Sequence, residues 1–457
     1  MLPEKFILRM KKLLGEDFDD FDAALSRPAV KGVRRNLIKA DKEAFERAFA
    51  APLRPIPYTD NGYIPEGTFS LGSTPAHHAG MFYSQDPGAM ASATALDIGE
   101  DFYVLDTCSA PGGKSSQIAE RLGEGGFLLS NEYVPKRAKI IVTNFERLGV
   151  RRAMVTSYDT AELAKMYDAF FDLAICDAPC SGEGMFRKCE EAIEDWSEEN
   201  VLACAERQLY ILDNTAGTVK WGGYLLYSTC TYSPEENERV VDKFLDAHPE
   251  FSIVPVRAAL AAASCDGLVP EGSSREELKL TRRFYPHVNE GEGQYVALMK
   301  KRDNPDISPT ILYKDGAKAP TKEECAIVEK FFADNFKTAP KGRLIKQGEG
   351  IALVEHGVPI PKRSVFMPGV MVGEIRGKNF FPHHQLFSAF GRDMRCTEEL
   401  RAGDARVEKY LRGEEISASD PSLSGWVCIT YEGAPLGGGK ASSGIIKNHY
   451  PKGLRSH

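Results

Sequence analysis

The sequence lacks the features that mark membrane, secreted and strongly basic proteins. No apolar run approaches the length of a membrane-spanning helix, and charges interrupt the apolar residues of the N-terminal segment MLPEKFILRMKKLL, so no membrane segment or secretory signal is expected. Basic residues are not in excess, since the net charge is -8. Any binding of nucleic acid therefore has to use local basic patches.

Paired metal ligands are also missing. Ten cysteines are present, but none forms a CxxC pair and none lies beside a histidine pair at ligand spacing, so we expect no zinc or other metal site. Free thiols fit a protein of the reducing cytoplasm. With 457 residues, of which 42% are hydrophobic and 27% charged, the chain is expected to form two or three globular domains.

Strand-like and helix-like segments alternate between residues 77 and 302, which predicts an α/β fold with a mostly parallel sheet. Strands are expected at Phe102–Asp106, Gly126–Glu132, Ala153–Asp159, Phe171–Asp177 and Tyr224–Cys230. Helices are expected between them, over Lys114–Leu122, Pro135–Leu148 and Val201–Val219. A late apolar run, Gln294–Met299, would add a strand at one edge of the sheet.

The flanking regions offer two basic segments. Residues 27–43 are rich in cations, which form a solvated face or, if the rest of the chain requires one, a phosphate contact; they include Lys31, Arg34, Arg35, Lys39 and Lys42. The tail carries Lys440, Lys447, Lys452 and Arg455 without an acid and is the second candidate. Before residue 27, helical spacing predicts a core-facing stripe made by Phe6, Met10, Leu13 and Leu14. The polar, proline-containing residues 301–322 read as a linker.

The first candidate ligand site is a strand, turn and helix at Val104–Ser115, VLDTCSAPGGKS. Glycines let backbone N–H groups approach a ligand closely, and a helix N-terminus favours a negative group. A Walker A loop needs a glycine five residues before Gly113, where Cys108 stands, and the dinucleotide pattern GxGxxG is absent. The turn therefore fits a smaller nucleoside ligand, unless it serves packing alone.

Acidic residues end four consecutive predicted strands: Asp106, Glu132, Asp159 and Asp177. Any one of them could be a helix cap or a solvated carboxylate. Glu132, however, stands about where a carboxylate binds ribose hydroxyls in doubly wound folds. The four acids together predict a binding site at one edge of the sheet.

Two cysteines are placed at the same edge. Cys180 lies in the glycine-containing loop Asp177–Lys188, DAPCSGEGMFRK, and Cys230 follows a strand in Tyr224–Glu238, YLLYSTCTYSPEENE. Ser233 before Pro234, with acids behind them, predicts that a helix opens there. The two thiols could be a redox pair, two inert core residues, or a nucleophile with a second thiol that has its own catalytic task.

The motifs DTCSAPGGK, DAPCSGEG and STCTYSPEENE, in this order and spacing, resemble RNA cytosine-C5 methyltransferases of the nucleolar-protein/Sun family. Residues 80–90 (GMFYSQDPGAM) and 282–301 (RRFYPHVNEGEGQYVALMKK) fit the same family. In the C-terminal part, MPGVMVGEIRGKNFFPHHQL and GWVCITYEGAPLGGGKASSGIIKNHYPKGLR resemble bacterial methyltransferases of small-subunit ribosomal RNA, whose tail includes a PUA-like RNA-binding module.

The resemblance implies a Rossmann-like class I methyltransferase sheet that depends on S-adenosyl-L-methionine, with a small N-terminal region and a C-terminal α+β part that ends in a PUA-like module. It divides the chain into an RNA-contacting N-terminal region (1–75), a catalytic domain (76–302), a linker (303–322), an intermediate domain (323–390) and the PUA-like module (391–457).

Carried over by position, the resemblance places S-adenosyl-L-methionine at the turn formed by Cys108, Ser109, Ala110, Pro111, Gly112, Gly113 and Lys114. Glu132 would bind the ribose hydroxyls, Asp159 the adenine end, and Asp177 would lie between cofactor and base. Cys230 would be the nucleophile that adds to carbon 6 of cytosine, so that carbon 5 can accept the methyl group. Cys180 would assist the later release.

The expected reaction is formation of 5-methylcytosine in small-subunit (16S) ribosomal RNA through a covalent Cys230–cytosine intermediate, by a monomer without an obligate protein partner. A transfer-RNA methyltransferase is an alternative within the same chemistry. Two other classes stay open: a P-loop-like nucleotide hydrolase, suggested by PGGKSS, and a catalytically silent RNA-binding assembly factor. The intact Cys180 and Cys230 argue against the silent factor.

Overall fold

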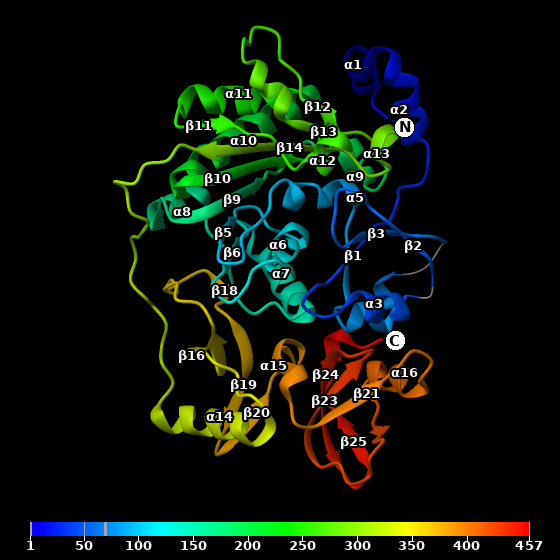
Figure 1. Ribbon diagram of the computed structural model, residues 1–457, viewed down its shortest axis with the longest axis vertical. Helices are drawn as coiled ribbons and strands as arrows, with labels where there is room; N and C mark the ends of the chain where they lie inside the picture. Colours follow the sequence, from blue (N-terminus) through cyan, green and yellow to red (C-terminus); the bar gives the residue numbers. More distant parts are fainter. Residues whose placement is uncertain (1, 50, 68–70, 457) are drawn as a thin grey trace.

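A ten-stranded sheet forms the centre of the computed structural model, which describes residues 2–49, 51–67 and 71–456 (Figure 1). Its order is β12-β13-β14-β10-β9-β5-β6-β7-β18, and β11 also pairs with β14. The parallel strands are β5 (Tyr103–Asp106), β6 (Phe127–Asn131), β7 (Ala153–Thr156), β9 (Phe171–Asp177) and β10 (Val219–Thr229). The antiparallel ones are β11 (Phe251–Ile253), β12 (Cys265–Asp266), β13 (Arg282–Phe284), β14 (Gln294–Lys301) and β18 (Val365–Met367).

The predicted strands and helices of this region are confirmed, with shifts of a few residues at their ends. The helices are α6 (Gly113–Ala119), α7 (Pro135–Leu148), α8 (Thr160–Met166), α10 (Glu198–Thr218) and α11 (Glu238–Ala247). The prediction that Gln294–Met299 lies at an edge is wrong, because β14 pairs with β10 on one side and with β11 and β13 on the other.

The two faces of the sheet are covered by different helices. Because side chains alternate along a strand, Leu105 and Leu129 belong to the cluster that contains Leu212 of α10. Val104 belongs to the opposite cluster, which contains Ile141 of α7. The catalytic region is thus a three-layer α/β sandwich, typical of a doubly wound fold.

The N-terminal region packs onto this sandwich through two helices and a small sheet. Helices α1 (Glu4–Leu14) and α2 (Phe18–Leu25) bury Phe6, Met10 and Phe21. Of the predicted stripe, Phe6 and Met10 are thus buried, whereas Leu13 and Leu14 are half-buried. The sheet has the order β2-β3-β1-β4. Its strands are β1 (Val33–Arg35), β2 (Leu53–Pro55), β3 (Gly62–Pro65) and β4 (Phe82–Ser84), and α3 (Lys42–Ala48) comes between β1 and β2 in the chain.

The basic segment at residues 27–43 does not form one solvated face. Arg34 is fully buried, 2.8 Å from the carboxylate of Glu120. Lys39 is also buried, and its Nζ donates to Ser388 Oγ at 2.9 Å and to the carbonyl of Pro435 at 2.7 Å. These two cations hold parts of the fold together and are not available to phosphates.

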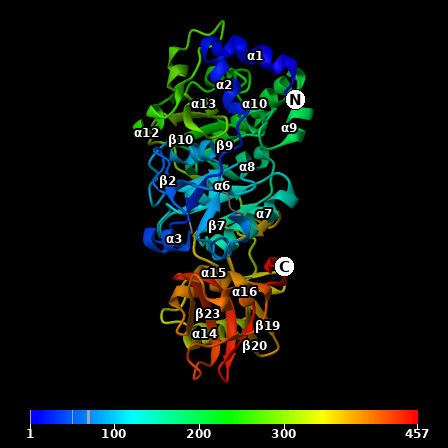
Figure 2. The ribbon, with the colours of Figure 1, turned by 90° about the vertical axis from the view of Figure 1, so that its right-hand side faces the viewer.

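The C-terminal half forms two further sheets at one end of the long axis of the molecule (Figure 2). The first, with α14 (Lys322–Asn335) and α15 (His384–Phe390), has β16 (Arg343–Gln347), β17 (Gly350–Val354), β19 (Val370–Arg376) and β20 (Asn379–Pro382). The second, with α16 (Ala405–Arg412), has β21 (Thr397–Leu400), β22 (Ile416–Ser417), β23 (Gly425–Tyr431), β24 (Ala434–Ser442) and β25 (Ile445–Asn448).

Two short strands connect the segment after residue 302 to the catalytic region, one of them in a separate two-stranded sheet. In the segment expected to be a linker, β15 (Thr310–Ile311) pairs with β8 (Tyr167–Asp168). Strand β18 pairs antiparallel with β7 and completes the central sheet. Within the described residues, no helix combines the length and apolar character needed to cross a bilayer.

Candidate active site

The carboxyl ends of the parallel strands gather the predicted acids. Asp106 and Asp177 are the last residues of β5 and β9, and Glu132 directly follows β6. Asp159 does not end a strand, since β7 stops at Thr156. It caps α8, where its Oδ1 accepts hydrogen bonds from the Ala161 N–H at 2.8 Å and from Tyr210 Oη at 2.9 Å. Three acids therefore lie where predicted, and the fourth also has the structural role of a cap.

The turn between β5 and α6 closes tightly around a buried carboxyl group. Gly112 has a φ of 102°, a left-handed conformation that favours glycine, and α6 begins at Gly113. Asp106 accepts hydrogen bonds from Ser115 Oγ at 2.6 Å and from the Cys108 N–H at 3.3 Å. Burial raises its pKa to about 7. A cavity of about 190 Å³ lies against this turn.

That cavity also reaches Asp177, which lies in the middle of the edge. Lys114 Nζ is 2.8 Å from Asp177 Oδ2, and Ser228 Oγ donates to Asp177 Oδ1 at 2.7 Å. Burial lowers the pKa of Lys114, but the Asp177 carboxylate outweighs burial and the pKa is raised. Lys114 is therefore a charged partner of Asp177 as well as a member of the turn.

The two thiols meet at the same edge. The Sγ atoms of Cys180 and Cys230 are 3.3 Å apart, and both residues are partly exposed, which is not the environment of two inert core thiols. The hydrogen bond to Cys230 and burial raise the pKa of the Cys180 thiol well above its usual range. Cys180 can thus stay protonated while the neighbouring Cys230 acts as the nucleophile.

Beneath the thiols lies Glu236, a residue that the sequence analysis missed. It is fully buried and accepts hydrogen bonds from the Ser181 N–H at 2.9 Å and from Gln208 Nε2 at 2.8 Å. Burial raises its pKa to about 7. Ser181 also meets Thr231 at 3.0 Å between their hydroxyl oxygens. Glu236 therefore joins the residue after Cys180 to the strand end that carries Cys230.

Glu183, also missed, holds the other thiol loop. Its carboxylate accepts hydrogen bonds from Thr231 Oγ1 at 2.9 Å, from the Tyr232 N–H at 3.0 Å and from Ser233 Oγ at 2.7 Å. Because Ser233 is engaged in this way, it caps no helix, and α11 begins only at Glu238; the predicted helix start is wrong. Both acids stand inside the quoted motifs, Glu183 three residues after Cys180 and Glu236 six residues after Cys230, so their place in the same motifs as the cysteines is the available signal.

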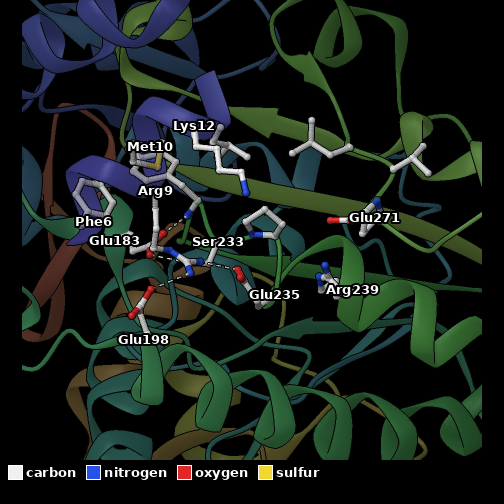
Figure 3. Close-up of a pocket in the computed structure, with 16 residues that line it drawn as sticks. Phe6, Arg9, Met10, Lys12, Glu183, Glu198, Ser233, Glu235, Arg239 and Glu271 are labelled. Carbon is white, nitrogen blue, oxygen red and sulfur yellow. Dashed lines mark hydrogen bonds and ion pairs between the residues drawn. The ribbon is translucent and has the colours of Figure 1, made fainter. Parts of the chain in front are cut away.

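A larger cavity, of about 580 Å³, lies between α1 and the segment after Cys230 (Figure 3). Arg9 crosses it and lies 2.7 Å from the Glu235 carboxylate and 3.8 Å from that of Glu198. Through Glu235 this arginine fastens α1 to the segment after Cys230, and through Glu198 it fastens α1 to the start of α10. Within the described part of the chain, no cluster of three His, Cys, Asp or Glu residues has the arrangement of a metal site.

Three family models match the chain. Residues 2–87 match the N-terminal domain of 16S rRNA methyltransferase RsmF, residues 93–300 match 16S rRNA methyltransferase RsmB/F, and residues 397–456 match the methyltransferase RsmF PUA domain. The expected PUA module and the resemblance to this family are thereby confirmed.

Relatives of full length exist. Ribosomal RNA small subunit methyltransferase F of Klebsiella pneumoniae is 30% identical and covers 99% of this chain and 96% of its own length. The protein of that name from Enterobacter sp. is 31% identical, with coverages of 99% and 95%. Among solved structures, a methyltransferase homologue from Pyrococcus horikoshii gives a TM-score of 0.57 at 27% identity and covers 65% of this chain and 95% of its own. The predicted Rossmann-like methyltransferase fold is confirmed.

Proposed function

Since the chain belongs to the RsmB/F family of 16S rRNA methyltransferases, we propose that it makes 5-methylcytosine in small-subunit ribosomal RNA through a covalent bond between Cys230 and the target cytosine. It is an RNA methyltransferase that depends on S-adenosyl-L-methionine. The observation that carries the covalent route is the 3.3 Å contact between Cys180 and Cys230 at the edge that also holds Asp177.

The residues of the turn fit the cofactor. The left-handed Gly112 lets the chain turn sharply between the Asp106 carboxyl group and α6, and the cavity against it is lined by Cys108–Pro111, Gly113 and Lys114. When bound, S-adenosyl-L-methionine supplies an electrophilic methyl group on a positively charged sulfur. Asp106 and Asp177 offer the carboxylates that suit such a cation.

Two further acids keep an oxygen for the nucleoside part of the cofactor. The hydrogen bonds of Glu132, from the Val134 N–H at 3.0 Å and from Arg137, use Oε1, which leaves Oε2 for the ribose hydroxyls. The bonds of Asp159 use Oδ1, which leaves Oδ2 for the adenine end. The structural bonds hold each carboxylate in a fixed orientation.

The addition step uses three residues. The Cys230 thiolate bonds to carbon 6 of cytosine, and the electron pair displaced from the ring double bond makes carbon 5 nucleophilic. Asp177 accepts a hydrogen bond from the cytosine amino group and from the ring nitrogen once that nitrogen is protonated. Lys114, 2.8 Å from Asp177, can supply this proton.

The release step uses the second thiol. After methylation carbon 5 carries a proton that must leave before the ring double bond re-forms and the Cys230 sulfur departs with its electron pair. Once the Cys230 sulfur is bonded to carbon 6, the hydrogen bond between the two thiols that raises the pKa of Cys180 is lost. Cys180 can then release its own proton to water, and its thiolate takes the carbon 5 proton. Because the two sulfurs lie in contact, a base bound to Cys230 comes within reach of Cys180.

The remaining assignments complete the proposal. The partner is small-subunit ribosomal RNA, the enzyme acts as a cytoplasmic monomer, and residues 1–75 and the PUA-like module 391–457 contact the RNA on either side of the catalytic domain 76–302. The linker 303–322 and the intermediate domain 323–390 connect these parts. What supports this division is that the N-terminal and PUA family matches flank the catalytic one.

The test is transfer of labelled methyl from S-adenosyl-L-methionine to unmodified small ribosomal subunits, free small-subunit RNA and bulk transfer RNA, with Cys230→Ala as the control. We expect label in the subunits or their RNA, located in 5-methylcytosine and reduced more than about a thousandfold in the variant. The variant should still bind the cofactor, because the thiol lies outside the turn. Label in transfer RNA alone would overturn the substrate, and normal turnover by the variant would overturn the mechanism.

A further inference from the structure

A hollow of about 560 Å³ lies along α8. It is separate from the thiol edge, the sheet edge that carries Asp177, Cys180 and Cys230, since none of these residues lines it. Three segments distant in the sequence form its wall. They are the stretch from β7 into α8, the β15 region, and the loop before β18, which contribute Tyr158, Glu162, Lys165, Met166, Tyr313, Lys314, Pro361, Lys362 and Arg363. These nine residues form the α8 hollow.

The charge of the α8 hollow is strongly unbalanced. Lys165, Lys314, Lys362 and Arg363 face a single acid, Glu162, whose carboxylate closes the capping box at the start of α8. Within the described residues, none of the four cations has a carboxylate within 4.0 Å. The four positive charges repel one another, and a bound anion reduces this repulsion. The excess stands out in a chain whose net charge is -8.

The walls of the hollow are held in place by bonds that do not involve the cationic groups. Tyr158 Oη donates to the carbonyl of Arg363. Tyr313 Oη donates to the carbonyl of Pro359 at 2.7 Å and lies 2.7 Å from Tyr167 Oη, while the Gly316 N–H donates to the carbonyl of Ile360 at 2.7 Å. The cations therefore extend from a framework that exists before any ligand binds.

We propose that the α8 hollow binds the phosphodiester backbone of a single-stranded segment of the substrate RNA. Four cations without ion-pair partners match the phosphates, and the rings of Tyr158 and Tyr313 offer surfaces on which a base can stack. The volume suits one or two nucleotides rather than a duplex. The hollow begins beside Asp159 at the cofactor edge, so a strand leaving that edge can continue along α8. The proposal rests on the RNA substrate proposed above.

The experiment compares two double variants that remove the same charge from the full-length protein. Lys362→Ala with Arg363→Ala empties part of the hollow and keeps the backbone carbonyl that Tyr158 binds. Lys243→Ala with Lys322→Ala removes two exposed lysines elsewhere. Binding of a fluorescent small-subunit RNA fragment is measured without cofactor at several salt concentrations, so no methyl transfer contributes.

We expect the hollow variant to bind the RNA about tenfold more weakly than the control, with a salt slope smaller by one to two and an unchanged affinity for S-adenosyl-L-methionine. Equal affinity and slope in the two variants would overturn the proposal. The rise in Tm on addition of tripolyphosphate is measured for the same two variants. If the hollow variant loses this rise but binds the RNA as tightly as the control, the hollow binds a small anion and the proposal is wrong. Methyl transfer by the wild-type protein is measured in a separate experiment, so a negative result for the α8 hollow does not affect the proposed reaction.

Discussion

The thiol edge and the α8 hollow are organised in opposite ways. At the thiol edge the charged groups are buried or half-buried and have partners within the protein: Glu183 and Glu236 accept hydrogen bonds from the two cysteine loops, and Lys114 is bound to Asp177. In the hollow, Lys362 and its neighbours are exposed and have no acidic partner among the described residues. The first arrangement holds side chains in position, whereas the second leaves cations available to bind an anionic ligand.

The difference teaches how charge can be read in this fold. A buried carboxylate that accepts several hydrogen bonds orients the groups around it. Its removal should displace the catalytic groups and change RNA affinity less. An exposed cation without a partner contributes to long-range attraction and is sensitive to salt. Substitutions at the two regions should therefore change different observables.

After Cys230→Ala, the strongest effect is expected for Cys180→Ala. Without the second thiol the carbon 5 proton has no positioned base, so turnover should fall by more than about a hundredfold while a covalent protein–RNA adduct accumulates. A denaturing gel with RNA and cofactor measures the adduct. Cys325→Ala, a partly exposed cysteine of α14, is the control. If no slower-moving species forms, Cys180 has no role in release.

An intermediate effect is expected for Glu236→Gln. The amide keeps one acceptor oxygen but turns a donor toward Ser181 or Gln208, so the loop of Cys180 should shift and kcat should fall about tenfold, with a higher steady-state fraction of adduct. The control is Glu398→Gln, which removes another buried carboxylate, in the second C-terminal sheet. This variant should have a lower Tm but an unchanged kcat and adduct fraction. Equal adduct fractions in the two variants would make Glu236 merely structural.

A smaller effect is expected for Lys440→Ala with Lys447→Ala. These lysines are exposed cross-strand neighbours on β24 and β25, and Lys440 Nζ lies 5.7 Å from the centre of the Trp426 ring. Their loss should weaken RNA binding about threefold and leave kcat unchanged. Titration of the labelled RNA fragment measures the change. An unchanged affinity would remove the tail from the RNA footprint.

The smallest effect is expected on the pH dependence of stability and concerns Lys39, which is buried and binds Ser388 and the Pro435 carbonyl but no carboxylate. Burial lowers its pKa from 10.5 to about 7. Between these values the unfolded chain keeps a proton that the folded chain has released, so this group makes stability rise with pH across that window and contributes no slope below it. Lys39→Met should remove the slope, measured as Tm at pH 7, 8 and 9. Parallel Tm profiles of wild type and variant would contradict this.

Much of the catalytic sheet could be predicted because its strands and helices are long and strongly patterned. Helix α7 begins and ends where the sequence predicts, and β9 does too. The short strand β18 could not be predicted, since three residues carry little periodicity and its partner β7 lies some 200 residues away. The helix expected after Ser233 fails because a distant acid, Glu183, binds that hydroxyl group.

The same contrast applies to the site. The thiols and the acids of the strand ends could be located because parallel strands bring their carboxyl ends to one edge. The burial of Arg34 and Lys39 could not, because their partners Glu120 and Ser388 come from distant segments. The α8 hollow is the clearest case, as no single stretch of sequence contains more than two of its four cations.

Strand β18 has a consequence for how the protein comes into being. During synthesis, residues 76–302 leave the ribosome with the backbone of β7 unpaired along one side, and its partner at Val365–Met367 appears only later. An unpaired strand side is a template for association with another chain. Catalytic competence should therefore arrive late, when about four fifths of the polypeptide has emerged, and a fragment that stops at residue 302 should aggregate through the unpaired side of β7.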